Sequence, residues 1–319
     1  VYKRQWVTRA VPGRSLKKWS PKVPKSRRQK LEHCWNALAE SFPHLSADPL
    51  PAGGRIACRV EYNGADFNGW QTQPHPGTRT VQQVLETALG AVADHAVRVH
   101  CAGRTDTGVH GHCQVIHFDA PAARSPKAWV LGANGSLPED VRVHWAVPVA
   151  GTFHARFSAL SRRYRYLIAN ASVRTPLFNR QLTWHRYPLD AQLMHAEAQA
   201  LLGEQDFSAF RAASCQSSSP MRNVHSVQVA RRGELVVIDI QANAFLHHMV
   251  RNIVGTLMAV GAGRQPPGWT AQVLQGRDRT RAADTAAPHG LYLADVGYPV
   301  EYSLPPTPFG PLFLGPGPG

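Results

Sequence analysis

The sequence of 319 residues is poor in cysteine and contains no long apolar run. Its five cysteines are odd in number and form no C-x-x-C pair, which argues against a disulfide framework and against a zinc site built from cysteines. No stretch approaches the roughly eighteen apolar residues that a membrane helix needs, and the chain opens with basic residues rather than with an apolar leader. We therefore expect no membrane span, no signal peptide and a cytoplasmic location.

Nucleotide-binding signatures are also missing. Neither G-x-x-x-x-G-K-[ST] nor G-x-G-x-x-G occurs, so no motif predicts a loop that would cradle a phosphate group or a dinucleotide. The sequence therefore gives no reason to expect a cofactor.

Acidic residues are scarce at one end of the chain. The net charge of +14 comes from 35 basic and 21 acidic residues, but residues 1–30 hold eleven Lys or Arg and no acid. The remainder carries 24 basic and 21 acidic residues, a net charge of only +3. The basic start is either an arm that attracts RNA or a leader foreign to the natural protein, and neither alternative decides the function.

Composition and periodicity divide the chain into four parts. Residues 1–53 lack periodicity and end in the linker-like PLPAGG, so we expect a basic extension that is disordered or non-native. Residues 54–152 and 153–303 form two halves rich in strands, and residues 304–319 are a Pro/Gly-rich tail. Two such halves predict an α+β fold with the active site in a cleft between them.

Apolar periodicity predicts the elements within the two halves. Alternation predicts strands over 55–62, 97–101, 112–118, 162–170, 223–230, 234–242 and 290–298. Helical spacing predicts helices behind Thr80 over 80–94, within 189–203 and over 245–260.

One carboxylate is placed in an unusual setting. Asp106 lies in GRTDTGVH, on the predicted connection between two strands, two residues after Arg104. Asp-Thr-Gly is also the motif of aspartic proteases, but those enzymes share one proton between two such motifs, and no second motif occurs. A carboxylate kept ionised by nearby cations suits a nucleophile or a general base.

Three histidines follow closely. His110, His112 and His117 have a spacing that metal ligands can have, yet no carboxylate with a defined position accompanies them. We expect these histidines to be packing or surface residues and expect no metal.

The segment RRYRY alternates cations with aromatic residues. On a strand, Tyr164 and Tyr166 share one face while Arg163 and Arg165 share the other. This pattern fits a platform that stacks on bases and contacts phosphates, and it equally fits a core tyrosine pair with solvated arginines.

A third segment, NAFLHHMVRNIVG, is an apolar helix that places His247 and Arg251 four residues apart. A buried arginine would need an anionic partner, for which Asp106 is a candidate. The alternative is a solvated helix face.

Taken together, these stretches closely resemble the TruA-type tRNA pseudouridine synthases. The matching blocks, in the order of the family, are YNGADFNGWQTQP (62–74), CAGRTDTGVHGHCQVIHF (101–118), FHARFSALSRRYRY (153–166), ANAFLHHMVRNIVG (242–255), GLYLADVGYP (290–299) and GPLFL (310–314). The resemblance implies the pseudouridine synthase fold, with a mixed, mainly antiparallel sheet.

The resemblance also implies residue roles. Asp106 matches the catalytic aspartate, the nucleophile that releases uracil from ribose so that the ring can rejoin through carbon 5. Tyr164 matches the tyrosine that stacks on the target base, and Arg251 matches the arginine that pairs with the aspartate. Leu291 matches the apolar residue that lines the pocket, and Arg104 matches the arginine that fills the space left by the flipped nucleotide.

The implied substrate is uridine at positions 38–40 of the tRNA anticodon arm, modified by a homodimer without cofactor or metal. We further expect Arg163 and Arg165 to contact backbone phosphates. The rival hypothesis is a non-catalytic RNA-binding or tRNA-folding protein that uses the same basic cleft. Both hypotheses predict tRNA binding, but only the enzyme would form pseudouridine.

Overall fold

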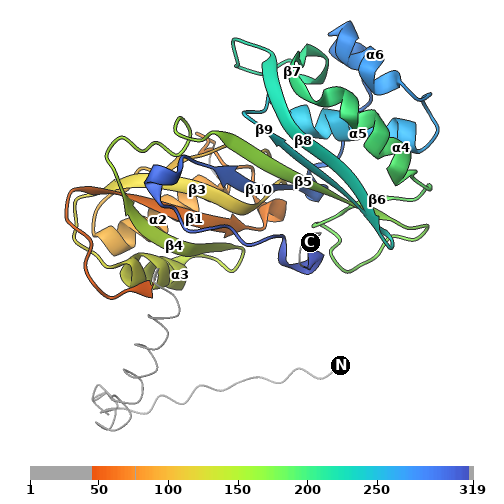
Figure 1. Cartoon of the computed structure of the whole chain (residues 1–319). Helices are drawn as coiled ribbons and strands as arrows, with labels where there is room; N and C mark the ends of the chain where they lie inside the picture. The colour runs from red at the N-terminus through yellow and green to blue at the C-terminus, as the bar shows by residue number, and fades with distance from the viewer. Residues whose placement is uncertain (1–44, 76, 316–319) are drawn as a thin grey trace, which may run out of the picture. The chain divides into compact units, whose positions relative to one another are not determined.

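The computed structural model describes residues 45–75 and 77–315 (Figure 1). Most of the predicted basic extension therefore lies outside the described residues. Packing nevertheless begins before the predicted boundary at residue 53. Leu45 and Leu50 pack against the core of the N-terminal half, and the amide of Leu50 donates to the carbonyl of Arg124 over 2.9 Å.

Ten strands form one sheet within the described residues. Their bounds are β1 Gly54–Tyr62, β2 His100–Cys101, β3 His110–Ala120, β4 Val141–Val149, β5 Ser161–Asn170, β6 Thr183–His185, β7 Gly203–Asp206, β8 Met221–Arg232, β9 Leu235–Ala242 and β10 Leu291–Gly297. The main order is β4-β1-β3-β10-β5-β9-β8-β7, with β2 beside β3 and β6 beside β5. Only the β10–β3 and β5–β6 pairs are parallel, which confirms a mixed, mainly antiparallel sheet.

Strand β10 joins the two halves into this one sheet. Tyr292 and Leu293 pair with His110 and Gly111 of β3, while the opposite edge of β10 pairs with β5 over most of its length. A strand from the end of the chain therefore lies directly beside the end of the loop that carries Asp106. This arrangement brings the loop next to β5, which carries the tyrosines.

Helices cover the sheet in two separate groups (Figure 1). Their bounds are α2 Val81–Ala93, α3 Ala133–Ser136, α4 Ala191–Ala198, α5 Met249–Gly261 and α6 Trp269–Gly276. The first two pack with β1, β3 and β4, and the other three pack near β5, β8 and β9. The α+β prediction is confirmed. None of the described helices is long and apolar enough to cross a membrane.

Most predicted elements are confirmed, but two differ. Helix α2 begins after Thr80, whose hydroxyl accepts from the amide of Gln83, as the sequence predicts. The predicted strand over 97–101 is reduced to His100–Cys101. The predicted helix over 245–260 begins only at Met249, because His248 adopts a left-handed backbone with φ of 61°.

The last described residues are not a loose tail. The Cys113 thiol lies 3.0 Å from the Thr307 hydroxyl, and the Phe309 ring covers the guanidinium of Arg165 at 3.8 Å from the ring centroid. Arg232 donates to the carbonyl of Leu314 over 2.7 Å. This segment thus contacts β3, β5 and β8 and belongs to the packed part of the protein.

Candidate active site

The loop that carries Asp106 is held by residues from β1 and β3. The buried amide of Gln114 accepts from the amide of Ala102 at 3.1 Å and donates to the carbonyl of Gly103 at 2.6 Å. The hydroxyl of Tyr62 lies 2.8 Å from that of Thr105. Because these groups are buried, the loop has little freedom to move, and Asp106 is held in a defined place.

A second segment touches the back of the loop. The amide of Trp70 donates to the carbonyl of Thr105 over 3.0 Å. Gly69 has φ of 87°, and a Cβ at this position would come within 3.0 Å of the same carbonyl. Position 69 therefore favours glycine for two reasons: the backbone has a positive φ, and two chain segments approach each other closely there.

The carboxylate of Asp106 contacts three side chains from one short segment. Arg251 Nη1 and His248 Nε2 each lie 3.3 Å from Oδ2, and His247 Nε2 lies 3.3 Å from Oδ1. The Asp106 side chain is 27% exposed, so a substrate retains access to it. The predicted pairing of Arg251 with Asp106 is present in the structure, and the alternative of a solvated helix face is not.

Arg251 is fixed by a second contact. Its Nε donates to the carbonyl of Ala286 over 2.8 Å, and its side chain is 13% exposed. The neighbouring carbonyl of Ala287 accepts from the hydroxyl of Tyr166 at 2.7 Å. The guanidinium thus links the Asp106 loop to the segment before β10, in a partly buried setting where a charged hydrogen bond is stronger than in water.

His247 and His248 lie at the start of α5, with ring centroids 4.0 Å apart. The Nδ1 of His247 lies 3.0 Å from the hydroxyl of Ser214. Burial lowers the pKa of His248, and the nearby charge of Asp106 opposes this shift. The sequence predicts that His247 and Arg251 lie four residues apart on one helix, but His247 precedes α5. The backbone turn at His248 brings the His247 ring to the Asp106 carboxylate instead.

Tyr164 lies on the face of β5 that is turned toward the core. Its side chain is 9% exposed and meets the ring of Phe245 edge to face at 5.0 Å. A Cβ added to Gly103 would lie 3.6 Å from the Tyr164 hydroxyl, which places this hydroxyl beside the loop that carries Asp106. Burial raises the pKa of Tyr164, and the charge of Asp106 adds to the effect. Tyr164 is therefore a protonated phenol at neutral pH.

Leu291 begins β10 opposite Tyr166 and is buried in the same core cluster as Tyr164. Tyr164 and Tyr166 share one face, as the alternation predicts, and both belong to this cluster. Arg104 follows Gly103 in the loop and is exposed. Of the predicted residues, Arg251 and Tyr164 therefore lie beside the Asp106 loop, Arg104 is exposed on it, and Leu291 is buried in the same cluster as Tyr164.

The geometry does not support a phosphate contact for Arg165. Arg165 and Arg163 both donate to Asp239 of β9, over 2.7 Å and 2.6 Å. The Arg165 side chain is only 4% exposed, and it also donates to the carbonyl of Gly310 beneath Phe309. The sequence could not show that both arginines pair with a single aspartate on the neighbouring strand. Arg163 has a side chain that is 37% exposed, so its phosphate contact stays a prediction.

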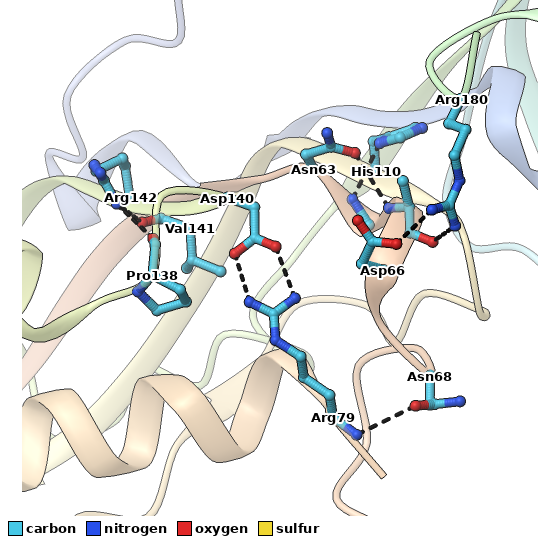
Figure 2. Close-up of polar contacts among 12 residues, drawn as sticks. Asn63, Asp66, Asn68, Arg79, His110, Pro138, Asp140, Val141, Arg142 and Arg180 are labelled. Atoms are coloured by element: carbon cyan, nitrogen blue, oxygen red, sulfur yellow. Dashed lines mark hydrogen bonds and ion pairs between the residues drawn. The ribbon is translucent and has the colours of Figure 1, made fainter. Parts of the chain in front are cut away.

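The three histidines near the loop have separate partners. His110 Nδ1 accepts from the amide of Gly64 over 3.1 Å, and Figure 2 shows this contact beside the pair of Arg180 with Asp66. His112 Nδ1 lies 3.2 Å from Glu61 Oε1. His117 Nδ1 accepts from the amide of Ala155 at 3.1 Å. These are packed, hydrogen-bonded histidines, as expected.

The N-terminal half is tied together by other polar contacts in Figure 2. Arg79 makes two parallel hydrogen bonds to the carboxylate of Asp140, at 2.7 Å and 2.8 Å, and thereby links the start of α2 to the segment before β4. Arg180, which comes from the C-terminal half between β5 and β6, reaches the carbonyl of Ala65 as well as Asp66. The two halves therefore meet through an ion pair as well as through β10.

A metal is not needed to explain the cluster at Asp106. Donor atoms of Asp106, His247 and His248 lie within 4.8 Å of one another, which is close enough to surround an ion. However, the guanidinium of Arg251 already neutralises the same carboxylate. We therefore interpret the group as a hydrogen-bonded cluster, and the expectation of no metal stays a prediction.

Two cavities lie elsewhere among the described residues. One, of about 300 Å³, is lined by Trp145, Tyr298 and the Pro305–Pro306 segment, and another, of about 270 Å³, is lined by Glu61, Asp140 and His144. Neither includes Asp106, so the predicted central cleft stays a prediction. The contacts of the Asp106 carboxylate identify the candidate site.

The sequence reasoning missed several residues of the site. His248 was not singled out, although it stands next to His247 in the same segment, and the paired histidines were the available signal. Tyr62 of β1, Gln114 of β3 and Gly69 in the segment after β1 contact the loop that carries Asp106. Tyr62 and Gly69 lie in the block YNGADFNGWQTQP and Gln114 in the block around Asp106, but nothing in those blocks shows which loop they contact.

Known proteins match this chain over nearly all of its described length. A family model described as tRNA pseudouridine synthase matches residues 57–158 and 198–299. The tRNA pseudouridine synthase A of Alcanivorax borkumensis is 53% identical over 82% of this chain and 97% of that protein. The enzyme of the same name from Histophilus somni is 53% identical over 82% of this chain and 96% of that protein. The one from Legionella pneumophila is 54% identical over 82% of this chain and 98% of that protein.

The crystal structure of a Cbf5-Nop10-Gar1 complex aligns with 75% of this chain and 57% of that chain, with a TM-score of 0.28 and 12% identity, which is too low to carry an argument. The sequence matches are sufficient without it, because both matched parts include segments that build the site. Asp106 lies in the first matched part, and His248, Arg251 and Leu291 lie in the second. The chain belongs to the tRNA pseudouridine synthase family.

Proposed function

We propose that this chain isomerises uridine to pseudouridine at positions 38–40 of the tRNA anticodon stem-loop, with Asp106 as the nucleophile. Family membership gives the reaction class, which is isomerisation of uridine in tRNA. The observation that supports the role of Asp106 is its carboxylate, 27% exposed and 3.3 Å from the guanidinium of Arg251. The positions within the tRNA rest on the resemblance of the sequence blocks to the TruA-type enzymes.

In the proposed reaction, Asp106 attacks the nucleoside and uracil leaves the ribose, turns and rejoins through carbon 5. A carboxylate attacks as the anion, and Arg251 Nη1 lies 3.3 Å from Oδ2 of Asp106. The product has the same composition as the substrate, so the reaction needs neither an oxidant nor a transferred group. For this reason we propose no cofactor.

The target base must leave its stack to reach a carboxylate held on the protein. Unstacking costs on the order of a few kcal/mol. In our proposal the ring of Tyr164 stacks on the flipped base, Leu291 lines its pocket, and the exposed Arg104 fills the space left in the stem. The Tyr164 hydroxyl lies next to Gly103 while the adjacent residue Arg104 is exposed, which supports this division of roles.

The proposed partner is the anticodon arm of tRNA, bound by a homodimer in the cytoplasm. Contacts between cations and phosphates give such binding a strong salt dependence. The cysteines among the described residues are all free, which suits a reducing compartment. The homodimer rests on the family resemblance, and light scattering of the purified protein would test it.

The test is nucleoside chromatography of an unmodified tRNA transcript after incubation with the protein and no added cofactor. A transcript with uridine at positions 38–40 should yield pseudouridine, and a matched transcript with cytidine at those positions should not. Pseudouridine formed equally from both transcripts would contradict the proposed positions. Binding of tRNA without any pseudouridine would favour the non-catalytic RNA-binding protein, which no comparison supports.

A further inference from the structure

The reaction needs a proton acceptor as well as a nucleophile. After the ring has rejoined through carbon 5, this carbon still carries its hydrogen. The C5–H bond must break, its electron pair must form the C5–C6 double bond, and nitrogen 1 must gain a proton. Proton loss and proton gain balance, so no co-reactant is required, but a base must stand near the carboxylate that attacked.

Few side chains near Asp106 can act as this base. Arg251 is a permanent cation and has no proton-accepting atom. Tyr164 is protonated at neutral pH, because burial raises its pKa, so it can donate a proton but not accept one. Among the described residues, the other side chains in contact with the Asp106 carboxylate are His247 and His248, each 3.3 Å from one of its oxygens.

The two histidines differ in how they are held. His247 Nδ1 lies 3.0 Å from the hydroxyl of Ser214, so its ring orientation is set by two partners. His248 makes no second side-chain hydrogen bond within the described part of the chain, and its side chain is less exposed, at 29% against 37%. His247 is therefore placed to orient the carboxylate, whereas His248 is free to exchange a proton.

The backbone at His248 supports a functional role. Its φ of 61° lies in the left-handed region, which glycine adopts readily and other residues adopt at a cost. This conformation ends the preceding loop, starts α5 and directs the imidazole toward Asp106. A glycine at this position would relieve the backbone but would remove the ring.

We propose that His248 is the base that accepts the proton from carbon 5 of the rejoined uracil. This inference rests on the proposed role of Asp106. When the carboxylate is released from the product, its negative charge returns 3.3 Å from His248 Nε2 and favours the protonated imidazole. His248 thereby becomes a stronger base at the step that requires one.

Electrostatics agree with this role in the resting enzyme. Burial lowers the pKa of His248, so the imidazole is neutral near pH 7 and able to accept a proton. The charged and titratable groups that act on it are Asp106, which raises its pKa, and His247, Arg251 and Arg279, which lower it. A neutral base beside an ionised nucleophile is the state that the reaction needs at its start.

The experiment compares His248→Gln with His247→Gln, using tRNA that carries either ordinary uridine or uridine deuterated at carbon 5. For His248→Gln we expect kcat to fall by about 100-fold or more, KM to change less than a few fold, and the deuterium isotope effect on kcat to rise above that of the wild type. For His247→Gln we expect a smaller loss and an unchanged isotope effect. Thermal unfolding would verify that both variants fold.

An unchanged isotope effect in His248→Gln would overturn the proposal, because a purely structural loss slows every step without making C5–H cleavage limiting. Wild-type kcat in this variant would overturn it as well. Failure of the wild-type protein itself to form pseudouridine would instead contradict the proposed function. The two failures are therefore distinguishable.

Discussion

Arg251 Nη1 lies 3.3 Å from Asp106 Oδ2, although 145 positions separate the two residues in the chain. Asp106 belongs to the loop before β3, and Arg251 belongs to the first turn of α5. The contact joins the two halves at the carboxylate that we propose as the nucleophile. It depends on β10, which places β3 and β5 in one sheet and so brings the loop next to the helix.

Replacing the nucleophile should separate chemistry from binding. We expect Asp106→Asn to form no detectable pseudouridine while its affinity for tRNA stays within a few fold of wild type. The amide keeps the size of the side chain but cannot attack, and the carboxylate repels phosphates rather than binding them. Nucleoside chromatography and filter binding would measure the two properties. Pseudouridine formation by this variant would refute the mechanism.

The role of Arg251 can be tested with Arg251→Lys and Arg251→Gln. A lysine retains the charge beside Asp106 but cannot also make the second hydrogen bond in the fixed geometry of a guanidinium, and glutamine loses the charge. We expect kcat to fall by about 100-fold or more in the glutamine variant and less in the lysine variant. Equal activity of both variants with wild type would show that Arg251 has no catalytic importance.

Substitution of the buried tyrosine should affect turnover more than binding. Tyr164→Phe keeps the ring and its edge contact with Phe245, so tRNA affinity should stay within about two-fold. The variant loses the hydroxyl beside the catalytic loop, and we expect kcat to fall by at least about ten-fold because a proton donor is removed. A kcat equal to that of the wild type would leave stacking as the only role of this residue.

Removal of residues 1–43 should weaken non-specific RNA binding without stopping catalysis. Positions 1–30 of this segment hold eleven Lys or Arg. Losing these cations should reduce the salt dependence of RNA binding. The deletion ends before Leu45 and Leu50, which pack against the core. Affinity for a non-cognate RNA would be measured at several salt concentrations. An unaltered salt dependence would contradict the expectation.

Two buried histidines should make the protein less stable in weak acid. Burial lowers the pKa of His110 to about 4 and that of His117 to about 3, below the ordinary value of 6.5. The unfolded chain therefore takes up protons that the folded chain resists, so stability is full above pH 6.5 and falls toward pH 4. Each group can contribute at most about 1.4 kcal/mol per pH unit.

Denaturant unfolding of the wild type and of His117→Asn between pH 7 and pH 4.5 would test this effect. The variant should be less stable at pH 7, because the side chain that accepts from the Ala155 amide is changed, yet its stability should depend less on pH. The same pH dependence in both proteins would show that His117 does not cause the loss.

The described elements show which features of the fold follow from local pattern. Strands β1 and β5 form where alternation predicts them, although most residues of both strands are buried. The helical spacing and the cap of α2 are also present in the structure. The late start of α5 is different. Apolar spacing predicts a helix from residue 245, but hydrophobic periodicity does not encode the backbone turn at His248. The left-handed backbone at this residue costs conformational energy, and it occurs where the His248 side chain contacts Asp106.

The sequence alone determined the family and with it the reaction class, because the matching blocks are runs of residue types that can be read without knowing distant contacts. The same blocks imply that Asp106 is the nucleophile, which stays a prediction. Tertiary structure decided which side chains contact one another around Asp106 and on β5. Pairing of β5 with β9 brought Asp239 to Arg163 and Arg165 and removed Arg165 from the surface. The insertion of β10 between β3 and β5 set His248 and Arg251 around Asp106. Residues far apart in the chain meet only when strands pair, and no local pattern specifies which strands will do so.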